Sequence, residues 1–416
     1  MEYVSDLLCI NCGRSYQPRP EQYLCGDCGE QGILEVGYDY PVLKKEWSRE
    51  QLKQNPDPSI WRYAPLLPVR PQTPRPRLRI GMTPLYQSKA LAERLGLNNI
   101  YIKDDGLNPT GSLKDRASAL AVVKGQEAGA DIVACASTGN AASSLAGNIA
   151  SMGGKMRAVI FIPARAPLGK LTQLLVYGAV VVSVQGSYQD AYRLSERAIR
   201  QWGWYNRNAA INPYLVEGKK TVTLELAEQL NWELPDWLVF SVGDGCTIAG
   251  AWKGLVDLKQ LGFIERLPRL LGVQAEGSAP ITKAFKSGKA LEVSEEDTLA
   301  DSIAVGNPRN HVKALRAIRA SGGDMVNVTD QEILEMIQLL AEKTGVFGEP
   351  AGVAGLAGLR KMTARGLIKA GEQVVAVITG NGLKDSKNAQ LATGKPFRVE
   401  PDFQILERIV KEGNLI

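Results

Sequence analysis

One lysine lies among small and polar residues in the stretch GLNPTGSLKDR, where an apolar run gives way to a helical pattern. Lys114 follows the predicted strand NIYIKDD, so its amine is expected at the carboxyl end of a parallel sheet. An ammonium group withdrawn from water loses proton affinity and can attack an aldehyde to form an imine. The alternatives are a solvent-facing lysine at a helix start and a reactive Lys103, which lies within the strand pattern itself.

Three other loops of similar composition also follow predicted strands. STGNAAS follows DIVACA, VGDGCTIAG follows WLVFS, and TGNGLKDS follows VVAVI. A single loop of this kind is weak evidence, because any tight turn favours glycine. In folds of this kind ligands bind at the carboxyl ends of the strands, so four such loops predict one site. The turn from Gly243 to Thr247 opens a helix, and its free backbone N–H groups suit a phosphate.

The scarcity of histidine narrows the chemistry of that site. His311 is the single histidine among 416 residues, which excludes a Ser-His-Asp triad and a multi-histidine metal centre. Catalysis must therefore use lysine, carboxylates, hydroxyls or a cofactor. A phosphate seat, an imine-forming lysine and the near absence of histidine together indicate pyridoxal phosphate, which carries the electronic work while the protein orients it.

Four of the six cysteines are grouped near the N-terminus in the pattern C-x2-C-x12-C-x2-C. They are Cys9, Cys12, Cys25 and Cys28. This spacing predicts two knuckles whose thiolates close a tetrahedron around zinc. Two disulfides are the alternative, disfavoured because no secretory signal precedes them. Four protein thiolates leave no open coordination position, so the zinc is expected to be structural.

Composition and charge favour a cytoplasmic protein that binds small molecules. The formal net charge is +5, and lysine and arginine are spread along the chain, so no nucleic-acid-binding surface is predicted. The first residues lack a signal-peptide pattern, and no apolar run reaches the about 18 residues of a membrane span. Five prolines between Pro65 and Pro76 predict an extended arm, either a free linker or an ordered strap.

Short β-branched runs alternate with helical segments from about residue 83 onward. The alternation predicts an α/β fold with parallel sheets covered by helices on both faces. Thr329 and Glu332 have the spacing of a capping box before one of these helices. We expect a zinc ribbon at 1–37, a proline-rich arm at 38–82 and a catalytic region at 83–416, with a small subdomain at about 120–205.

The motifs NPTGSLKDR, STGNAAS, NPYLVEGKKT and TGNGLKD occur in this order between residue 83 and about residue 390. They resemble the threonine synthase branch of the fold type II pyridoxal-phosphate enzymes, and the cysteine ribbon resembles an extension on some members. The resemblance implies a tryptophan synthase β-like architecture with two parallel-sheet domains, and a homodimer. It also implies a lyase of threonine biosynthesis that converts O-phosphohomoserine and water to threonine and phosphate.

The resemblance also implies roles for individual residues. Lys114 would hold the cofactor and then shuttle protons, and Thr379 would place a hydroxyl at the pyridine nitrogen. Asn140 would bond the phenolate oxygen of the cofactor as well as helping to bind substrate. The residues implied to grip the substrate carboxylate are Ser137, Thr138, Gly139 and Asn140. Those implied to cradle the cofactor phosphate are Gly243, Asp244, Gly245, Cys246 and Thr247.

Several positions depart from the pattern of typical relatives. Ala210 and Leu215 stand where a serine and an arginine suited to the substrate phosphate are usual. Lys219 replaces a glutamine and restores a positive charge there, Ala141 replaces a threonine, and Asp244 replaces an asparagine beside a dianion. These changes leave three alternatives: β-replacement on O-phosphoserine as in cysteate synthase, elimination as in a serine or threonine ammonia-lyase, and a regulatory zinc-ribbon protein.

Overall fold

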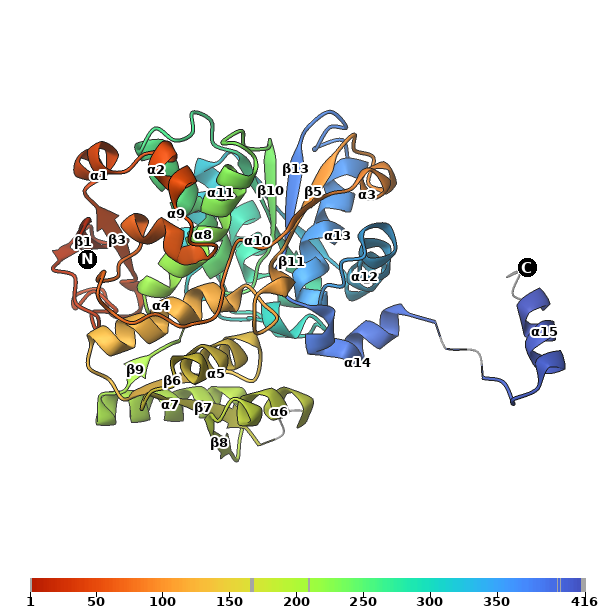
Figure 1. Ribbon diagram of the computed structural model, residues 1–416, viewed down its shortest axis with the longest axis horizontal. Coiled ribbons are helices and arrows are strands. Elements are labelled where there is room, and N and C mark those ends of the chain that lie inside the picture. The colour runs from red at the N-terminus through yellow and green to blue at the C-terminus, as the bar shows by residue number, and fades with distance from the viewer. Residues whose placement is uncertain (1, 165–167, 209, 395, 397, 413–416) are drawn as a thin grey trace.

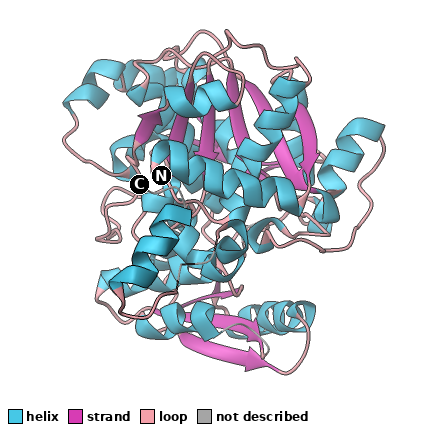
Figure 2. Cartoon of the chain, turned by 90° about the vertical axis from the view of Figure 1, so that its right-hand side faces the viewer, coloured by secondary structure: helices cyan, strands magenta, loops and turns pink. Residues whose placement is uncertain are grey.

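The computed structural model describes residues 2–164, 168–208, 210–394, 396 and 398–412. Three sheets organise these residues (Figure 1). Strands β1 (Val4–Cys9), β2 (Ser15–Tyr16) and β3 (Leu34–Tyr38) form a small antiparallel sheet. Two larger sheets follow, of six and four strands, each covered by helices (Figure 2). The predicted α/β architecture of two parallel sheets with an N-terminal cysteine ribbon is therefore confirmed.

The six-stranded sheet has the order β12-β11-β10-β13-β5-β4. All neighbours are parallel except β4, which pairs antiparallel with β5 at the edge. The strands are β4 (Leu85–Gln87), β5 (Ile100–Asp104), β10 (Trp237–Ser241), β11 (Arg269–Ala275), β12 (Asp324–Val328) and β13 (Val374–Ile378). The central strands β10 and β13 are almost entirely apolar and fully buried, because helices cover both faces of the sheet.

Helices cover this sheet, and one of them, α13, packs closely against β10. A Cβ on Gly355 of α13 would lie 3.3 Å from the backbone nitrogen of Ser241. A capping box formed by Thr329 and Glu332 begins α12, as predicted. The helices are α3 (Lys89–Arg94), α8 (Tyr214–Gln229), α9 (Cys246–Gln260), α10 (Pro280–Ser287), α11 (His311–Ala320), α12 (Asp330–Thr344) and α13 (Pro350–Ala364).

The four-stranded sheet has the order β8-β7-β6-β9, and all its pairs are parallel. Its strands are β6 (Ile132–Ala136), β7 (Arg157–Pro163), β8 (Val180–Val184) and β9 (Tyr205–Asn206). The accompanying helices are α4 (Lys114–Glu127), α5 (Asn140–Met152), α6 (Leu168–Val176) and α7 (Tyr188–Trp202). This sheet lies below the larger one in Figures 1 and 2, with α4 and α5 between them.

Helix α8 is buried between α4 and α9, and glycines allow this close approach. A Cβ on Gly218 would lie 2.8 Å from the carbonyl carbon of Arg116 in α4, and one on Gly250 would lie 3.0 Å from the Val216 carbonyl oxygen. The backbones of the three helices are thus nearly in contact, and side chains of α8 reach positions at the starts of both neighbours.

A buried ion network fixes α8 to α4 and β5. The Arg116 guanidinium pairs with Asp105 at 2.7 Å and with Glu225 at 2.5 Å. Lys103 pairs with the same Glu225 at 2.9 Å and donates to Gln229. Lys103 is therefore a structural cation with its own counter-charge, which removes it as a rival to Lys114.

The N-terminal segment continues through α1 (Tyr40–Glu46), α2 (Arg49–Gln54) and a 3-10 turn (Ile60–Leu66). The following prolines lie against α4, where the Arg70 N–H donates to Glu127 at 2.6 Å and Gln126 donates to the Pro74 carbonyl at 3.2 Å. This arrangement corresponds to an ordered strap rather than a free linker.

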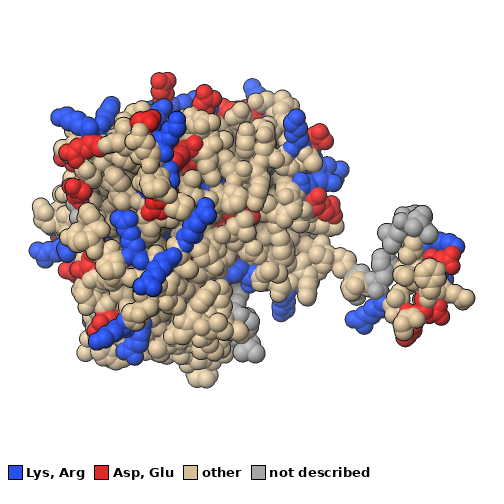
Figure 3. All heavy atoms as spheres, in the orientation of Figure 1, with Lys and Arg blue, Asp and Glu red and all other residues tan. Residues whose placement is uncertain are grey.

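The C-terminal segment runs through α14 (Ser386–Ala389) to α15 (Phe403–Glu412), which stands off from the rest of the chain (Figures 1 and 3). Acidic and basic side chains are interspersed on the face shown in Figure 3. Across the described residues, no helix has both the length and the apolar character needed to cross a membrane.

Candidate active site

The loop that carries Lys114 is joined to the loop after β13 through the backbone. Lys114 is the first residue of α4. The Leu113 N–H donates to the Thr379 carbonyl at 2.8 Å, and the Asn381 N–H donates to the Gly111 carbonyl at 3.0 Å. Because β5 and β13 are parallel neighbours, their carboxyl ends bring these two loops together. Two of the four predicted loops thus meet beside Lys114.

The environment of the Lys114 amine lowers its affinity for a proton. Its pKa is lowered from 10.5 to about 8, chiefly because burial disfavours the charged form. The positive charges of Lys219 and Arg207 lower the pKa further, whereas the negative charge of Glu349 raises it. A large share of the amine is therefore neutral near pH 8, the form that attacks an aldehyde.

The loop after β6 contributes Ser137, Thr138 and Gly139 and leads into α5, which begins at Asn140. The Gly139 N–H donates to the Ser137 hydroxyl at 3.2 Å, which shapes the turn. Asn140 is buried, and its amide nitrogen donates to the Glu349 carboxylate at 2.7 Å. That bond joins the small sheet's loop to the start of α13, across the two halves of the molecule.

Glu349 is a member of this site that the sequence analysis missed. Burial raises the pKa of its carboxyl, and the bond from Asn140 and the charge of Lys114 act in the opposite direction. Its signal in the sequence is a lone carboxylate within the glycine-rich stretch GEPAGVAGLAGL. A Cβ on Gly380 would lie 2.5 Å from the Glu349 carboxyl carbon, so a larger residue there would have to displace this carboxyl group.

The loop after β10 has the form of a phosphate seat at the start of α9. Gly245 precedes the helix at φ +85°, in the region that favours glycine. A Cβ on Gly243 would lie 2.9 Å from the Ile303 Cα, and one on Gly245 would lie 2.8 Å from the Ala314 Cβ. Cys246 is buried and Thr247 is partly exposed, both in the first turn of α9, where backbone N–H groups lack helical partners.

Asp244 lies within this loop, and Asn310 lies beside it. The Asp244 carboxylate accepts a bond from the Arg309 N–H at 3.0 Å, so one of its oxygens is engaged by the 301–310 segment. Burial raises the pKa of Asp244, which favours its neutral form beside a phosphate dianion. Asn310 is fully buried, and both polar atoms of its side chain lack a hydrogen-bond partner among the described residues. Such an amide is suited to a bound polar group.

The loop after β13 begins with Thr379, which is partly exposed. Its backbone lies against the first turn of α13, where a Cβ on Gly352 would lie 3.2 Å from the Thr379 nitrogen. The following Asn381 and Lys384 approach the Lys114 loop, since Lys384 donates to the Thr110 carbonyl at 3.0 Å. Lys384 also donates to Ser143 of α5 at 2.8 Å.

A cavity of about 100 Å³ opens between these loops. It is lined by Thr138, Gly139 and Asn140 on the side of the small sheet, and by Ser302, Glu349 and Lys384 on the other side. The loop predicted to bind the substrate carboxylate therefore lines this cavity.

The departures from the usual pattern have distinct positions. Leu215 is fully buried and packs in the apolar cluster of the small sheet with Ala117 and Cys135, so it faces the core. Ala210 is buried as well. Lys219 lies buried on α8, where burial lowers its pKa and the Cys246 thiol acts in the opposite direction. Lys219 thus places a cation beside the Gly243–Thr247 turn.

The residues present fit pyridoxal phosphate. Lys114 offers an amine with a lowered pKa, the Gly243–Thr247 turn offers free N–H groups at a helix start, and Asn310 offers an unpartnered amide. Thr379 and Asn140 supply neutral polar groups at the edges of the same region.

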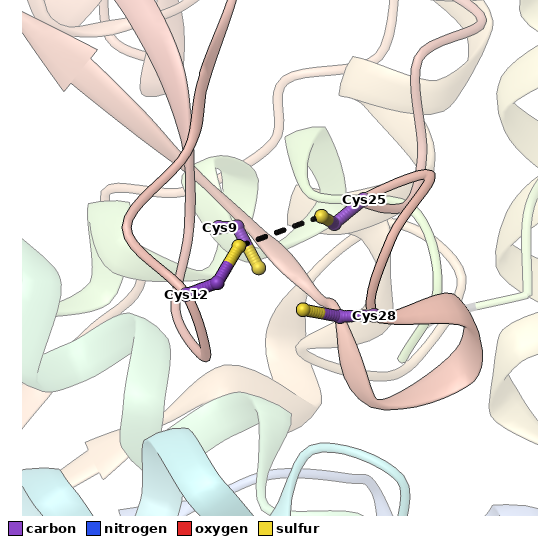
Figure 4. A group of neighbouring side chains, drawn as sticks. All are labelled: Cys9, Cys12, Cys25 and Cys28. Atoms are coloured by element: carbon purple, nitrogen blue, oxygen red, sulfur yellow. Dashed lines mark hydrogen bonds between the residues drawn. The ribbon is translucent and has the colours of Figure 1, made fainter.

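The four N-terminal cysteines also fit a metal. Their sulfur atoms all lie within 4.8 Å of one another, and those of Cys12 and Cys25 are 3.7 Å apart (Figure 4). A tetrahedral zinc with bonds of about 2.3 Å places its sulfur ligands about 3.8 Å apart. All four cysteines are free of disulfides. The Tyr16 hydroxyl donates to Cys25 at 3.0 Å and lowers the pKa of that thiol to about 6, which favours the thiolate that zinc binds.

Known proteins resemble this chain over nearly its whole length. Residues 76–380 match the model of the pyridoxal-phosphate dependent enzyme family. The threonine synthase of Methanocaldococcus jannaschii is 40% identical over 97% of this chain and 99% of its own. That of Methanosarcina acetivorans is 42% identical over 97% and 98%, respectively. The chain belongs to the threonine synthase family of pyridoxal-phosphate dependent enzymes. The cofactor inferred from the loops is the cofactor of this family.

Solved structures extend the likeness of fold beyond the threonine synthase family. Diaminopropionate ammonia lyase from Escherichia coli superposes with a TM-score of 0.65 and 18% identity, covering 83% of this chain and 92% of that one. Threonine deaminase isoform 2 from Solanum lycopersicum gives a TM-score of 0.63 at 24% identity, covering 75% and 87%. These matches show the shared architecture, which by itself does not determine the reaction.

The Glu349→Gln substitution tests the electrostatic state of this carboxyl. Since burial raises its pKa above the usual 4.5, the wild type loses stability relative to the glutamine variant as the pH rises above that value. We expect the variant to melt at a higher temperature than the wild type at pH 8, with the gap closing toward pH 4.5. Thermal unfolding of cofactor-free protein across that pH range measures it.

Glu349→Ala is the matched variant, because it removes the acceptor for Asn140 altogether. We expect turnover to fall by about tenfold or more in Glu349→Ala and to be largely kept in Glu349→Gln, whose amide oxygen still accepts the bond. Equal losses in both variants would contradict a positioning role for this hydrogen bond.

Proposed function

We propose that this chain converts O-phosphohomoserine and water to threonine and inorganic phosphate, with pyridoxal phosphate held by Lys114. The observation that carries the proposal is the nucleophilic Lys114, with its pKa near 8, at the meeting point of loops in a threonine synthase family chain. The identity to threonine synthases extends over 97% of the chain and so includes the cysteine ribbon and the catalytic region.

Bound pyridoxal phosphate supplies an electron sink that stabilises negative charge on the substrate carbons. The chain's own groups then orient the substrate and move protons. The Lys114 amine would take and return protons at those carbons, a role for which a pKa of about 8 is suited near neutral pH. Asn140, fixed by Glu349, presents its remaining amide hydrogen to the cofactor, and Ser137, Thr138 and Gly139 receive the substrate carboxylate.

The remaining parts of the site hold the cofactor. The backbone N–H groups of Gly245, Cys246 and Thr247 receive its phosphate at the start of α9, where the helix dipole adds to the attraction. Thr379 offers a neutral hydroxyl to the pyridine nitrogen. A metal at the ribbon cysteines has no open position for substrate, so zinc is structural in this proposal.

A second candidate, β-replacement on O-phosphoserine, is favoured by one observation. Leu215 and Ala210 offer no polar group where a phosphate-binding arginine and serine are usual in relatives, and Leu215 faces the core. A shorter phosphorylated substrate would place its phosphate elsewhere. If the substrate carries no phosphate, the related reaction is the elimination of serine or threonine.

The test is release of phosphate and threonine from O-phosphohomoserine by purified, cofactor-loaded protein. We expect equal amounts of the two products from the wild type and none from Lys114→Ala. Release of phosphate without threonine, or turnover of O-phosphoserine with sulfite in place of O-phosphohomoserine, would overturn the proposal.

We propose further that the enzyme acts in the cytoplasm as a homodimer, without a nucleic-acid or membrane partner. This proposal rests on the family resemblance and on the even spread of charge in the sequence. Light scattering on the loaded protein measures the assembly, and a mass of one chain would contradict it.

A further inference from the structure

Arg207 is a buried guanidinium that has no ion pair with any carboxylate of the described residues. It directly follows β9 and is 1% exposed. Its Nε and Nη2 atoms donate to the Ser118 hydroxyl at 3.2 and 3.0 Å. Throughout the described ranges no carboxylate forms an ion pair with Arg207, whereas Arg116, equally buried, has two.

An unpaired buried charge is costly, so a group of this kind normally has an anionic partner. The hydroxyl of Ser118 is held by Ser144 at 2.5 Å and supplies one neutral acceptor. Only two of the five guanidinium N–H groups donate to this hydroxyl, which is neutral and does not balance the charge. The geometry therefore indicates a place for an exogenous anion beside Arg207.

The position of Arg207 lies within the active site. Ser118 follows Lys114 by four residues in α4, and side chains at this spacing lie on the same face about 6 Å apart. The charge of Arg207 acts on both Lys114 and Lys219. The three cations are therefore near neighbours. The carboxylates whose charges act on them are Glu349 for Lys114, Asp115 for Arg207 and Asp244 for Lys219.

A neighbouring amide is also without a partner. Asn208 is buried, and its side-chain oxygen accepts a bond from the Ala136 N–H at 3.2 Å, at the carboxyl end of β6. Its amide nitrogen has no hydrogen-bond partner among the described residues. Arg207 and Asn208 therefore place donors at the end of β9, next to the strand that leads into Ser137.

Two phosphates have to be accommodated in this site if the proposed function holds. The cofactor phosphate has the backbone N–H groups at the start of α9. Arg207 belongs instead to the small sheet, on the same side as the Ser137–Asn140 loop that faces the substrate cavity. A guanidinium also suits a phosphate because its planar fork matches two oxygens.

We propose that Arg207, together with Lys219 and the Asn208 amide, forms the subsite for the substrate's phosphate group. Arg207 takes the part that an arginine at the position of Leu215 would otherwise play. The inference rests on the proposed function, since it names how a phosphorylated amino acid is held in the same site.

The test compares holoenzyme variants Arg207→Gln and Arg207→Lys with the wild type. The readouts are KM for O-phosphohomoserine, the inhibition constant of inorganic phosphate, and cofactor affinity from absorbance titration. We expect Arg207→Gln to raise the KM and the phosphate inhibition constant by about ten- to a hundredfold, the loss typical of a charge-assisted hydrogen bond. Arg207→Lys should lie between the two, because it keeps the charge without the fork.

Cofactor affinity is expected to stay at the wild-type level in both variants. A loss of cofactor binding with an unchanged phosphate inhibition constant would overturn the proposal and assign Arg207 to the cofactor. Arg309→Gln is the control, since its guanidinium stacks on Tyr192 at 4.2 Å and only its backbone contacts Asp244. It should leave the phosphate inhibition constant unchanged, and a rise equal to that of Arg207→Gln would show a general charge effect and overturn the proposal.

Direct binding of inorganic phosphate to the holoenzyme by calorimetry separates this inference from the proposed function. Binding that weakens in Arg207→Gln, in a protein that does not turn over O-phosphohomoserine, would uphold the subsite while the proposed substrate fails. Turnover with the same KM in Arg207→Gln as in the wild type would overturn the subsite while the function stands. Failure of the wild type to bind inorganic phosphate would also overturn the subsite.

Discussion

Replacement of Lys114 by alanine is expected to abolish turnover and the absorbance of lysine-bound cofactor. The amine is both the attachment point and the group placed to move protons, so its loss removes two functions at once. Removal of a general acid–base group alone typically costs about 10²- to 10⁴-fold, and we expect at least the upper end here. Product assays and an absorbance spectrum on the purified variant measure both effects.

Lys114→Arg is the matched control, because it keeps the positive charge near Glu349 but cannot form the covalent link. We expect it to be as inactive as the alanine variant and to retain a similar melting temperature. Substantial turnover by either variant would show that another amine carries the chemistry. The ion pair of Lys103 with Glu225 makes that lysine unsuited to the role.

The same amine predicts a pH dependence for cofactor uptake. Since the pKa of Lys114 is about 8, the neutral fraction rises with pH up to that value and then levels off. The rate at which cofactor-free protein captures pyridoxal phosphate should follow this curve in a stopped-flow measurement. A rate that keeps rising toward pH 10.5 would indicate an amine with the ordinary lysine pKa.

The elements around Lys114 were predictable because the sequence signals there are local. A glycine-rich turn after an apolar strand determines where a loop lies, and parallel pairing then brings loops from β5, β10 and β13 to one edge. The capping box at Thr329 is local in the same sense. The cysteine spacing predicted the cluster of four sulfur atoms because a knuckle is formed by neighbouring residues.

The residues that were missed depend on contacts between distant segments. Glu349 meets Asn140 across 209 positions of sequence, and no local pattern identifies such a pair. Arg207 resembles any arginine after a strand until its burial is known, together with its lack of an ion pair within the part of the chain that the structure describes. Leu215 is the opposite case. The sequence pattern places it where relatives have a substrate-binding arginine, but in the structure its side chain is part of an apolar core. The packing around the small sheet determines the surroundings of both Arg207 and Leu215.

Removal of zinc is expected to destabilise the ribbon and, through it, the active site. Structural zinc contributes about 10–16 kcal/mol to the folding of isolated zinc-finger peptides. In this chain Leu7, Leu34 and Val36 of the ribbon are fully buried in the same core as Leu43 and Ala314. Loss of the metal would therefore do more than unfold a peripheral loop, because it would also expose apolar surface of the main body.

The ribbon contacts the two helices that border the phosphate site. The Tyr38 hydroxyl donates to Glu217 of α8 at 2.6 Å, two residues before Lys219. Lys313 of α11 donates to the Leu34 carbonyl at 2.6 Å, three residues after Asn310. Displacement of β3 would break both bonds and leave Lys313, a buried cation, without its acceptor. Cofactor affinity should then fall together with stability.

The Cys25→Ser substitution tests this argument, with Cys135→Ser as its matched control. Both thiols are buried, but Cys135 lies in the small sheet's core, away from the four-sulfur cluster. We expect bound zinc to fall from one per chain to none in Cys25→Ser, with a melting temperature lower by about 10 °C. At about 2.1 cal/mol/K per residue this shift corresponds to roughly 9 kcal/mol if the 416-residue chain unfolds as one unit. Cys135→Ser should keep its zinc. An unchanged melting temperature in metal-free Cys25→Ser would show that the apolar contacts of β1 and β3 hold the ribbon in place unaided, and that α8 and α11 do not depend on the metal.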